Sequence, residues 1–324
     1  MWRRILIVLA VVLVVLAVVG IWKWWHETPS PKGEAYVSMN GSTLWNGTGL
    51  VRNRIERLDW GERLTLLDTY GDLVEVRTPR GRIGWVHQSN LMEPAVWREL
   101  GILAERVRHM PTQAPAHTGV LSNLRLDPGR TSPRIGQLLP NTPVEVLARG
   151  IATWAGGPGG RPEKQNWLLV RAHLPDGSQI AGWVLGDFIQ EDLPAPLTAY
   201  ASSSNVAPVA WFALRKMPDP RLGPQPNYLM AGSDEPDGGA CDFTMIGVYT
   251  WSVRRQHYVT AFVKRNLCGL MPIDVKFEDD PQKDVLFSFR NLVPHGIPQK
   301  ITYRMRSTMV TLIPTNPSPR LPGR

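Results

Sequence analysis

The sequence predicts a predominantly β protein made of several small modules that follow one apolar segment. The first observation is the run Ile5–Ile21, which contains no charged residue. The second is a repeated pattern that closes on Gly-Trp-Val in both copies, at Gly84–Val86 and Gly182–Val184. The third is the alternation of apolar and polar residues in short segments separated by turn residues. Together they predict an all-β fold, with one transmembrane helix, two small β-barrels and a C-terminal antiparallel β domain.

The N-terminal segment, residues 1–26, is predicted to be a transmembrane anchor. With a rise of about 1.5 Å per residue, Ile5–Ile21 covers most of a bilayer core of about 30 Å. A cleaved signal peptide is the alternative, but the apolar stretch exceeds a usual signal core and no small-x-small cleavage site follows it. Aromatic and basic residues flank the segment as at a membrane interface: Trp2, Arg3, Arg4, Trp22, Trp24, Trp25.

Residues 27–34 form a polar, proline-containing tether between the anchor and the first module. Lys23 and Lys32 nearly balance Arg3 and Arg4, so the count of basic residues decides little about orientation. We place the N-terminus in the cytoplasm because the downstream features suit an extracytoplasmic domain. The predicted location is the inner membrane of a bacterium, crossed once, with the bulk of the chain in the periplasm.

An internal repeat begins after the tether. Ser42–Leu67 aligns without gaps on Ser122–Leu147, with identical residues recurring at a constant offset. Farther on, Asp72–Arg77 matches Asn166–Arg171, and both copies then reach Gly-Trp-Val. The second copy differs mainly by the insertion Gly150–Gln165. Each copy consists of short alternating segments, which predicts a small closed barrel.

The order LxLxPGxxxxxIGxL, VEVL, NWLLVR and GWV in Leu124–Val184 resembles a bacterial SH3 (SH3b) domain, and Ser42–Leu91 resembles a more divergent one. The resemblance implies SH3-like barrels in residues 35–93 and 118–193. Where the family usually has Asn-Val-Arg after the first strand, the copies have Leu44–Asn46 and Leu124–Leu126. These departures weaken any transfer of ligand specificity.

Residues 94–117 are predicted to be a helical linker between the barrels. Val96, Leu100, Leu103 and Val107 fall on one helical face, and Pro111 ends the helix. We expect this face to pack against the barrels, and a docking helix for a partner is the alternative.

The C-terminal module, residues 199–313, is predicted to be an antiparallel β domain of no family that we identify. Met245–Trp251 and His257–Val263 alternate and are bridged by Ser-Val-Arg-Arg-Gln, as in a hairpin. Residues 314–324 form a proline-rich tail.

The two cysteines are predicted to form a disulfide. If the hairpin turns on Arg254–Arg255, the numbers of paired residues sum to 509, which places Cys241 opposite Cys268. Opposed strand residues lie within about 5.5 Å between Cα atoms, a span that a disulfide can bridge. Two free thiols are the alternative. A disulfide would also favour an oxidising compartment.

No catalytic or cofactor site emerges from the sequence, so we expect a non-enzymatic protein without cofactor or metal. SH3b modules often accompany cell-wall peptidases, but Cys241 and Cys268 lie in strand-and-turn sequence, where a helix-borne thiolate is not expected. The histidines are scattered without metal-binding spacing. The net charge of +8 is interspersed along the chain, which favours a solvated basic surface. Attraction to an anionic partner or membrane face is the alternative, and a nucleic-acid partner is not expected.

Four tryptophans are candidate functional or structural residues. Trp85 and Trp183 close the same unit in each copy, so we assign both to barrel packing. Trp45 replaces a usual polar position, and Trp154 lies in the glycine-rich insertion. An exposed aromatic of this kind can anchor an interface, so Trp45 and Trp154 are the candidate partner-binding residues.

Two functions remain open from the sequence. The first is a membrane-anchored accessory or scaffold protein that holds a protein partner at the outer face of the membrane, within a larger complex such as an electron-transport or photosynthetic assembly. The second, implied by the SH3b resemblance, is binding of peptidoglycan by the barrel pair. A hydrolase would require a catalytic constellation that the sequence does not offer.

Overall fold

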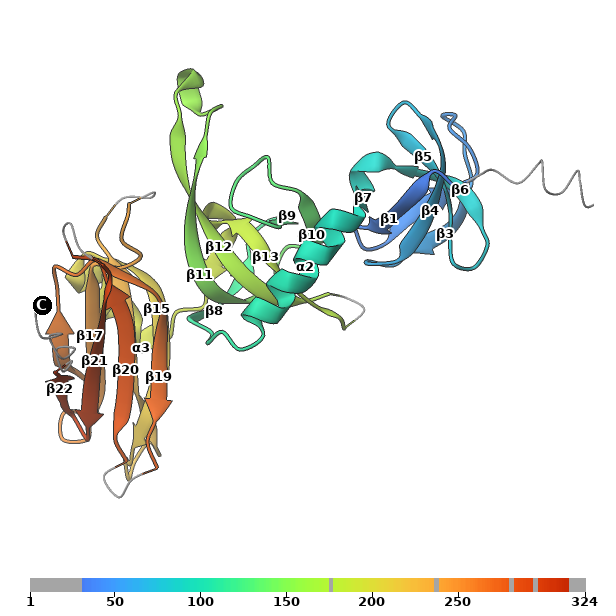
Figure 1. Ribbon diagram of the computed structural model, residues 1–324. Coiled ribbons are helices and arrows are strands. Elements are labelled where there is room, and N and C mark those ends of the chain that lie inside the picture. Colours follow the sequence, from blue (N-terminus) through green and yellow to red (C-terminus); the bar gives the residue numbers. More distant parts are fainter. Residues whose placement is uncertain (1–30, 175–176, 236–238, 280–282, 294–296, 315–324) are drawn as a thin grey trace, which may run out of the picture. The chain divides into compact units, whose positions relative to one another are not determined.

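The computed structural model describes residues 31–174, 177–235, 239–279, 283–293 and 297–314, and these residues are predominantly β (Figure 1). Two α-helices occur among them, α2 (Pro94–Val107) and α3 (Ala195–Ser204). The predicted transmembrane segment Ile5–Ile21 and its flanking residues lie outside the described residues. No helix in the described part of the chain combines the length and apolarity that a membrane span needs. The chain divides into two compact units, residues 1–97 and 98–324.

The first unit contains one seven-stranded sheet, in the order β3-β2-β6-β5-β4-β1-β7. One hydrophobic cluster contains buried residues from strands β1 to β6. Leu58 on β3, at one end of the strand order, belongs to this cluster, and Leu91 on β7, at the other end, packs against it. The sheet therefore curls around a single core, and we call it the first barrel. Its strands are β1 (Gly33–Val37), β2 (Ser42–Trp45), β3 (Arg54–Leu58), β4 (Arg63–Tyr70), β5 (Leu73–Arg77), β6 (Ile83–His87) and β7 (Leu91–Met92).

The second unit begins with a sheet of the same strand order, β10-β9-β13-β12-β11-β8-β14, which we call the second barrel. A 3-10 turn precedes the last strand in both barrels, at Gln88–Asn90 and Gly186–Phe188. The sequence repeat thus corresponds to a repeated topology. The strands are β8 (Ala114–Thr118), β9 (Ser122–Arg125), β10 (Arg134–Leu138), β11 (Pro143–Trp154), β12 (Glu163–His173), β13 (Gln179–Leu185) and β14 (Ile189–Glu191).

Helix α2 ends at Val107, four residues before Pro111, the residue predicted to end it. The N–H groups of Arg108 and Met110 donate to carbonyls three residues back, so the chain leaves the helix through tight turns before Pro111. The apolar face is buried at Leu100, Leu103 and Val107 as predicted, whereas Val96 is half-buried.

The C-terminal module contains two four-stranded meanders, β15-β16-β17-β18 and β19-β20-β21-β22 (Figure 1). Leu229 and Val248 from the first sheet share one buried cluster with Phe287 and Phe289 from the second, so the two sheets form a sandwich. The strands are β15 (Ala207–Met217), β16 (Gln225–Ser233), β17 (Met245–Ser252), β18 (His257–Lys264), β19 (Gly269–Phe277), β20 (Val285–Asn291), β21 (Gln299–Arg306) and β22 (Met309–Ile313).

Candidate functional site

A row of four directly paired residues crosses the outer face of the first barrel. Asp68 on β4 pairs with Glu75, Glu75 pairs with Trp85, and Trp85 pairs with Trp45 on β2. Directly paired residues point to the same side of a sheet. The side is the outer one, because the neighbours of these residues belong to the core: Leu44, Val74, Val76 and Val86. Trp45 and Trp85 are therefore adjacent and half-buried on the surface.

The loop that follows Trp45 is closed at its base. The Asn46 N–H donates to the Asn53 carbonyl at 3.0 Å, and the Asn53 N–H donates back to the Asn46 side-chain oxygen at 2.8 Å. The Arg52 guanidinium lies 4.7 Å from the centre of the Trp45 ring, in cation–π contact. The loop, residues 46–53, is thus closed by hydrogen bonds at its base, and Arg52 near its end contacts the Trp45 ring.

Leu50 and Val51 form the tip of this loop, and both side chains are fully exposed, at 106% and 99% of their reference areas. Sequence reasoning singled out Trp45 but missed this pair. The available signal was an aliphatic dipeptide preceded by two glycines, Gly47 and Gly49, where no alternating strand pattern calls for apolar residues.

The equivalent tryptophan of the second barrel has different neighbours. Trp183 pairs with Leu169 and with Arg125, which occupies the position of Trp45. A Cβ added to Gly150 would lie 2.9 Å from the Trp183 ring and 3.0 Å from Pro128, so the ring lies directly over that glycine. Trp183 therefore packs on Gly150 of its own barrel, whereas Trp85 lies beside Trp45 on the outer face.

Trp154 lies at the end of the two-stranded arm formed by β11 and β12 (Figure 1). It pairs with Glu163, and the Arg130 guanidinium lies 4.3 Å from its ring centre. Arg130 also donates to the Gln165 side chain at 2.9 Å. Trp154 is half-buried, so its own barrel covers one face of the ring.

The predicted disulfide is confirmed. Cys241 and Cys268 are bonded, with 4.7 Å between their Cα atoms. The predicted register holds next to the turn, where Trp251 faces Tyr258, and then shifts by one residue at a bulge between Val248 and Tyr249. Both cysteines lie beyond the ends of β17 and β18, so the disulfide closes the open end of the hairpin.

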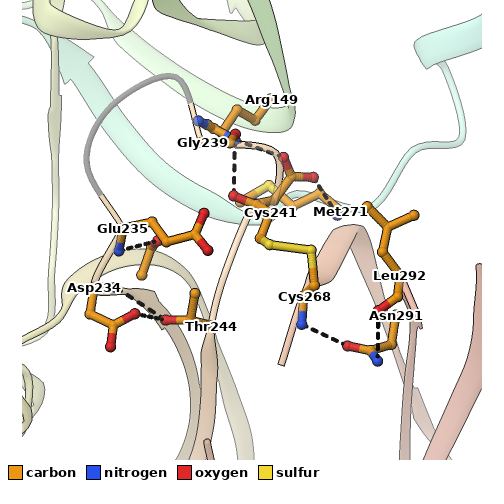
Figure 2. Close-up of a disulfide and its surroundings, with 12 residues drawn as sticks. Arg149, Asp234, Glu235, Gly239, Cys241, Thr244, Cys268, Met271, Asn291 and Leu292 are labelled. Atoms are coloured by element: carbon orange, nitrogen blue, oxygen red, sulfur yellow. Dashed lines mark hydrogen bonds and ion pairs between the residues drawn. A yellow bond between two sulfur atoms is a disulfide. The ribbon is translucent and has the colours of Figure 1, made fainter. Parts of the chain in front are cut away.

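Arg149 of the second barrel reaches the sandwich beside this disulfide (Figure 2). It donates to the carbonyls of Gly239 and Cys241 at 3.1 Å each, and it forms an ion pair with Asp242 at 3.2 Å. The two charged side chains are only 8% and 12% exposed. Burial raises the pKa of Asp242, while the Met271 N–H and Arg149 act in the opposite direction.

Gln113 makes a second junction between the second barrel and the sandwich. Its fully buried side chain accepts from the Ile273 N–H at 2.7 Å and donates to the Ile273 carbonyl at 3.2 Å. Its backbone accepts from Trp211 and donates to Val146. One residue thus satisfies the backbone of both sheets of the sandwich and of the barrel.

Several sequence predictions concern chemistry or membrane contact. The disulfide holds both cysteines, so neither is a thiolate nucleophile in this state. Within the described ranges, no group of three or more His, Cys, Asp or Glu side chains could hold a metal ion. The predicted interfacial residues lie outside the described residues: Trp2, Arg3, Arg4, Trp22, Trp24 and Trp25.

No family model and no curated protein matches the chain. Among solved structures, a NlpC/P60 family protein from Bacillus cereus is 15% identical over 89% of this chain and 96% of that chain, with a TM-score of 0.23. NlpC2 from Trichomonas vaginalis is 10% identical over 89% of this chain and 97% of that chain, with a TM-score of 0.18. NlpC1 from the same organism is 11% identical over 74% and 94%, also with a TM-score of 0.18. At these TM-scores the likenesses carry no argument about fold or activity.

Proposed function

We propose that the protein is a non-catalytic, membrane-anchored scaffold or accessory subunit that holds a partner at the outer face of a bacterial inner membrane. Its uncharged segment Ile5–Ile21 serves as the anchor, and the short tether that follows keeps the first barrel near the bilayer. The periplasmic placement agrees with the disulfide, which persists in oxidising compartments.

The observation that carries this proposal is the buried polar junction between the second barrel and the sandwich. Arg149 and Gln113 are almost entirely buried, and each satisfies backbone groups of the other module. Buried polar groups are costly unless paired, so these hydrogen bonds select one arrangement of the two modules. A fixed arrangement suits a protein that presents binding surfaces.

The surface that suits a protein partner is the row on the first barrel. Trp45 and Trp85 lie side by side, with Glu75 on one flank and Arg54 on the other, and Arg52 lies over the Trp45 ring. Aromatic side chains flanked by charges are typical of interface anchors. Trp154 is a second candidate, with one face covered by Arg130.

A second candidate function, binding of peptidoglycan, draws on the same row. Glu75 and Arg52 could pair with the charged groups of a stem peptide, and Trp45 could stack on a sugar or peptide plane. The resemblance to SH3b domains supports this reading only as a fold-level analogy.

Purification of the tagged full-length protein in mild detergent tests the proposal. We expect a stoichiometric protein complex, identified by mass spectrometry, and its partial loss in the Trp45→Ala variant. The matched control is Tyr70→Ala, because Tyr70 is an exposed aromatic of the same barrel outside the tryptophan pair, at 67% exposure. A monomeric wild-type protein would overturn the scaffold proposal. Retention on purified cell-wall sacculi, lost in Trp45→Ala, would favour the second function.

A further inference from the structure

The loop of residues 46–53 presents two aliphatic side chains to solvent. Leu50 and Val51 are fully exposed, and neither packs on the barrel core. The closed base at Asn46 and Asn53 holds the tip in place. An exposed apolar tip on a structured loop lowers its free energy when an apolar medium covers it.

The charges around the tip are basic. Arg54 pairs directly with Trp45 and is exposed on the same outer face, and Arg52 lies over the Trp45 ring. The β2–β3 hairpin, residues 42–58, carries three arginines and one glutamate, a net of 3 − 1 = +2. This combination of aliphatic tip and basic base matches a bilayer surface, where acyl chains lie beneath anionic headgroups.

The loop also lies near the point where the chain enters the barrel. Lys32, which precedes β1, forms an ion pair with Asp68 at 2.5 Å. Asp68 is the first residue of the outer row. Glu75 and Trp85 follow it on the next two strands, and Trp45 lies on the third. With strands about 4.8 Å apart, the loop begins roughly 14 Å from that ion pair.

Lys32 follows the apolar run closely in the sequence. About ten residues separate it from the apolar run that ends at Ile21, and they span at most roughly 35 Å when fully extended. A membrane that holds Ile5–Ile21 therefore lies within reach of the loop. A shorter, less extended tether would bring the two closer still.

We propose that loop 46–53 is a second membrane contact, in which Leu50 and Val51 enter the acyl boundary while Arg52 and Arg54 bind anionic phospholipid headgroups. The inference rests on the proposed anchoring by Ile5–Ile21, which brings the loop to the surface. The occupant of the loop is the bilayer itself, because two fully exposed side chains at a loop tip offer a protein partner little complementary surface. The contact would orient the first barrel on the membrane.

The test uses the full-length, disulfide-bonded protein in vesicles of phosphatidylcholine and phosphatidylglycerol. A polarity-sensitive dye is attached at position 50 through Leu50→Cys, and the control carries it through Leu139→Cys. Leu139 is an exposed leucine in a turn of the second barrel, at 59% exposure. We expect blue-shifted emission and a loss of intensity with brominated acyl chains at position 50, and neither at position 139.

The arginines provide an independent test. A basic residue near an anionic surface contributes about 1 kcal/mol, or roughly a fivefold change in lipid affinity. Arg54→Glu should therefore reduce the quenching at position 50 in anionic vesicles, while Arg108→Glu, an exposed arginine of the second unit, should not.

The outcomes separate the two proposals. Equal, weak quenching at positions 50 and 139 in protein that resists alkaline carbonate extraction would overturn loop insertion and leave the anchor standing. A blue shift without bromine quenching would show burial against protein and would also overturn it. Release by carbonate would overturn the anchor; strong quenching at position 50 before extraction would then still support loop insertion, and weak quenching would refute it.

Discussion

Removal of the Cys241–Cys268 disulfide should lower the stability of the sandwich by a calculable amount. The bonded residues are separated by 27 positions. Closing a loop of about 27 residues removes roughly 12 cal/mol/K from the unfolded chain, which is about 3.5 kcal/mol at 25 °C. A unit of this size shifts by about 2–4 °C for each kcal/mol, so the melting temperature should fall by roughly 7–14 °C.

Differential scanning calorimetry of the full-length protein measures this shift. The wild type is compared with and without reductant, and with the Cys241→Ala/Cys268→Ala variant. Because the effect belongs to the cross-link, the reduced wild type and the variant should melt together, and reductant should not affect the variant. A fall of less than about 2 °C would refute the loop-closure reasoning, since it corresponds to under about 1 kcal/mol.

Three further predictions concern buried groups. Arg149→Met should destabilise the protein by about 3 kcal/mol in urea unfolding, because Asp242 would remain buried without its cation, and Arg149→Met with Asp242→Asn should recover part of this loss. The pKa of Asp219 is lowered to about 2, mainly by a hydrogen bond from Trp251, so thermal stability should fall as the pH drops from about 4 toward 2, and Asp219→Asn should flatten this dependence. Gly84→Ala should cost about 1–3 kcal/mol, since its Cβ would lie 2.5 Å from a backbone oxygen, whereas Gly47→Ala, with open space around it, should be nearly neutral.

Each of these predictions has a result that contradicts it. Wild-type stability in Arg149→Met would show that the junction contributes nothing to folding. An Asp219→Asn variant that still loses stability between pH 4 and pH 2 would place the titrating group elsewhere. Equal effects of Gly84→Ala and Gly47→Ala would mean that the barrel adjusts freely where β2 and β6 approach each other.

Local patterns in the sequence were enough to predict much of the β architecture. The alternation in Met245–Trp251 and His257–Val263 predicted β17 and β18, and the turn position led to the cysteine pairing. The disulfide forms although the predicted register does not reach the cysteines: pairing shifts by one residue at Val248, and Phe243 bridges Gly269, three residues beyond the predicted partner. The Cα atoms of Cys241 and Cys268 still lie 4.7 Å apart, within the span of a disulfide. Strand-scale periodicity therefore tolerates small errors in pairing.

Contacts between modules could not be predicted in this way. Gln113 and Ile273 are 160 residues apart, and nothing in the local pattern around either one indicates the other. The same holds for Arg149, which directly precedes the insertion and whose burial against Asp242 has no local sequence signal. The exposure of Leu50 and Val51 is also a tertiary property, because an aliphatic pair between turn residues packs inward as readily as it points outward.

The different surroundings of Trp85 and Trp183 have a consequence for how the two barrels could have diverged after a duplication. In the second copy, several surfaces make internal contacts, through the β11–β12 arm, Arg149 and Gln113. Substitutions at these contacts would lower the stability of the fold. In the first copy the same strand order leaves the outer row open. Substitutions beside Trp85 can therefore change the outer surface of the first barrel without disturbing internal contacts, and under the proposed function such changes would alter which partner is bound.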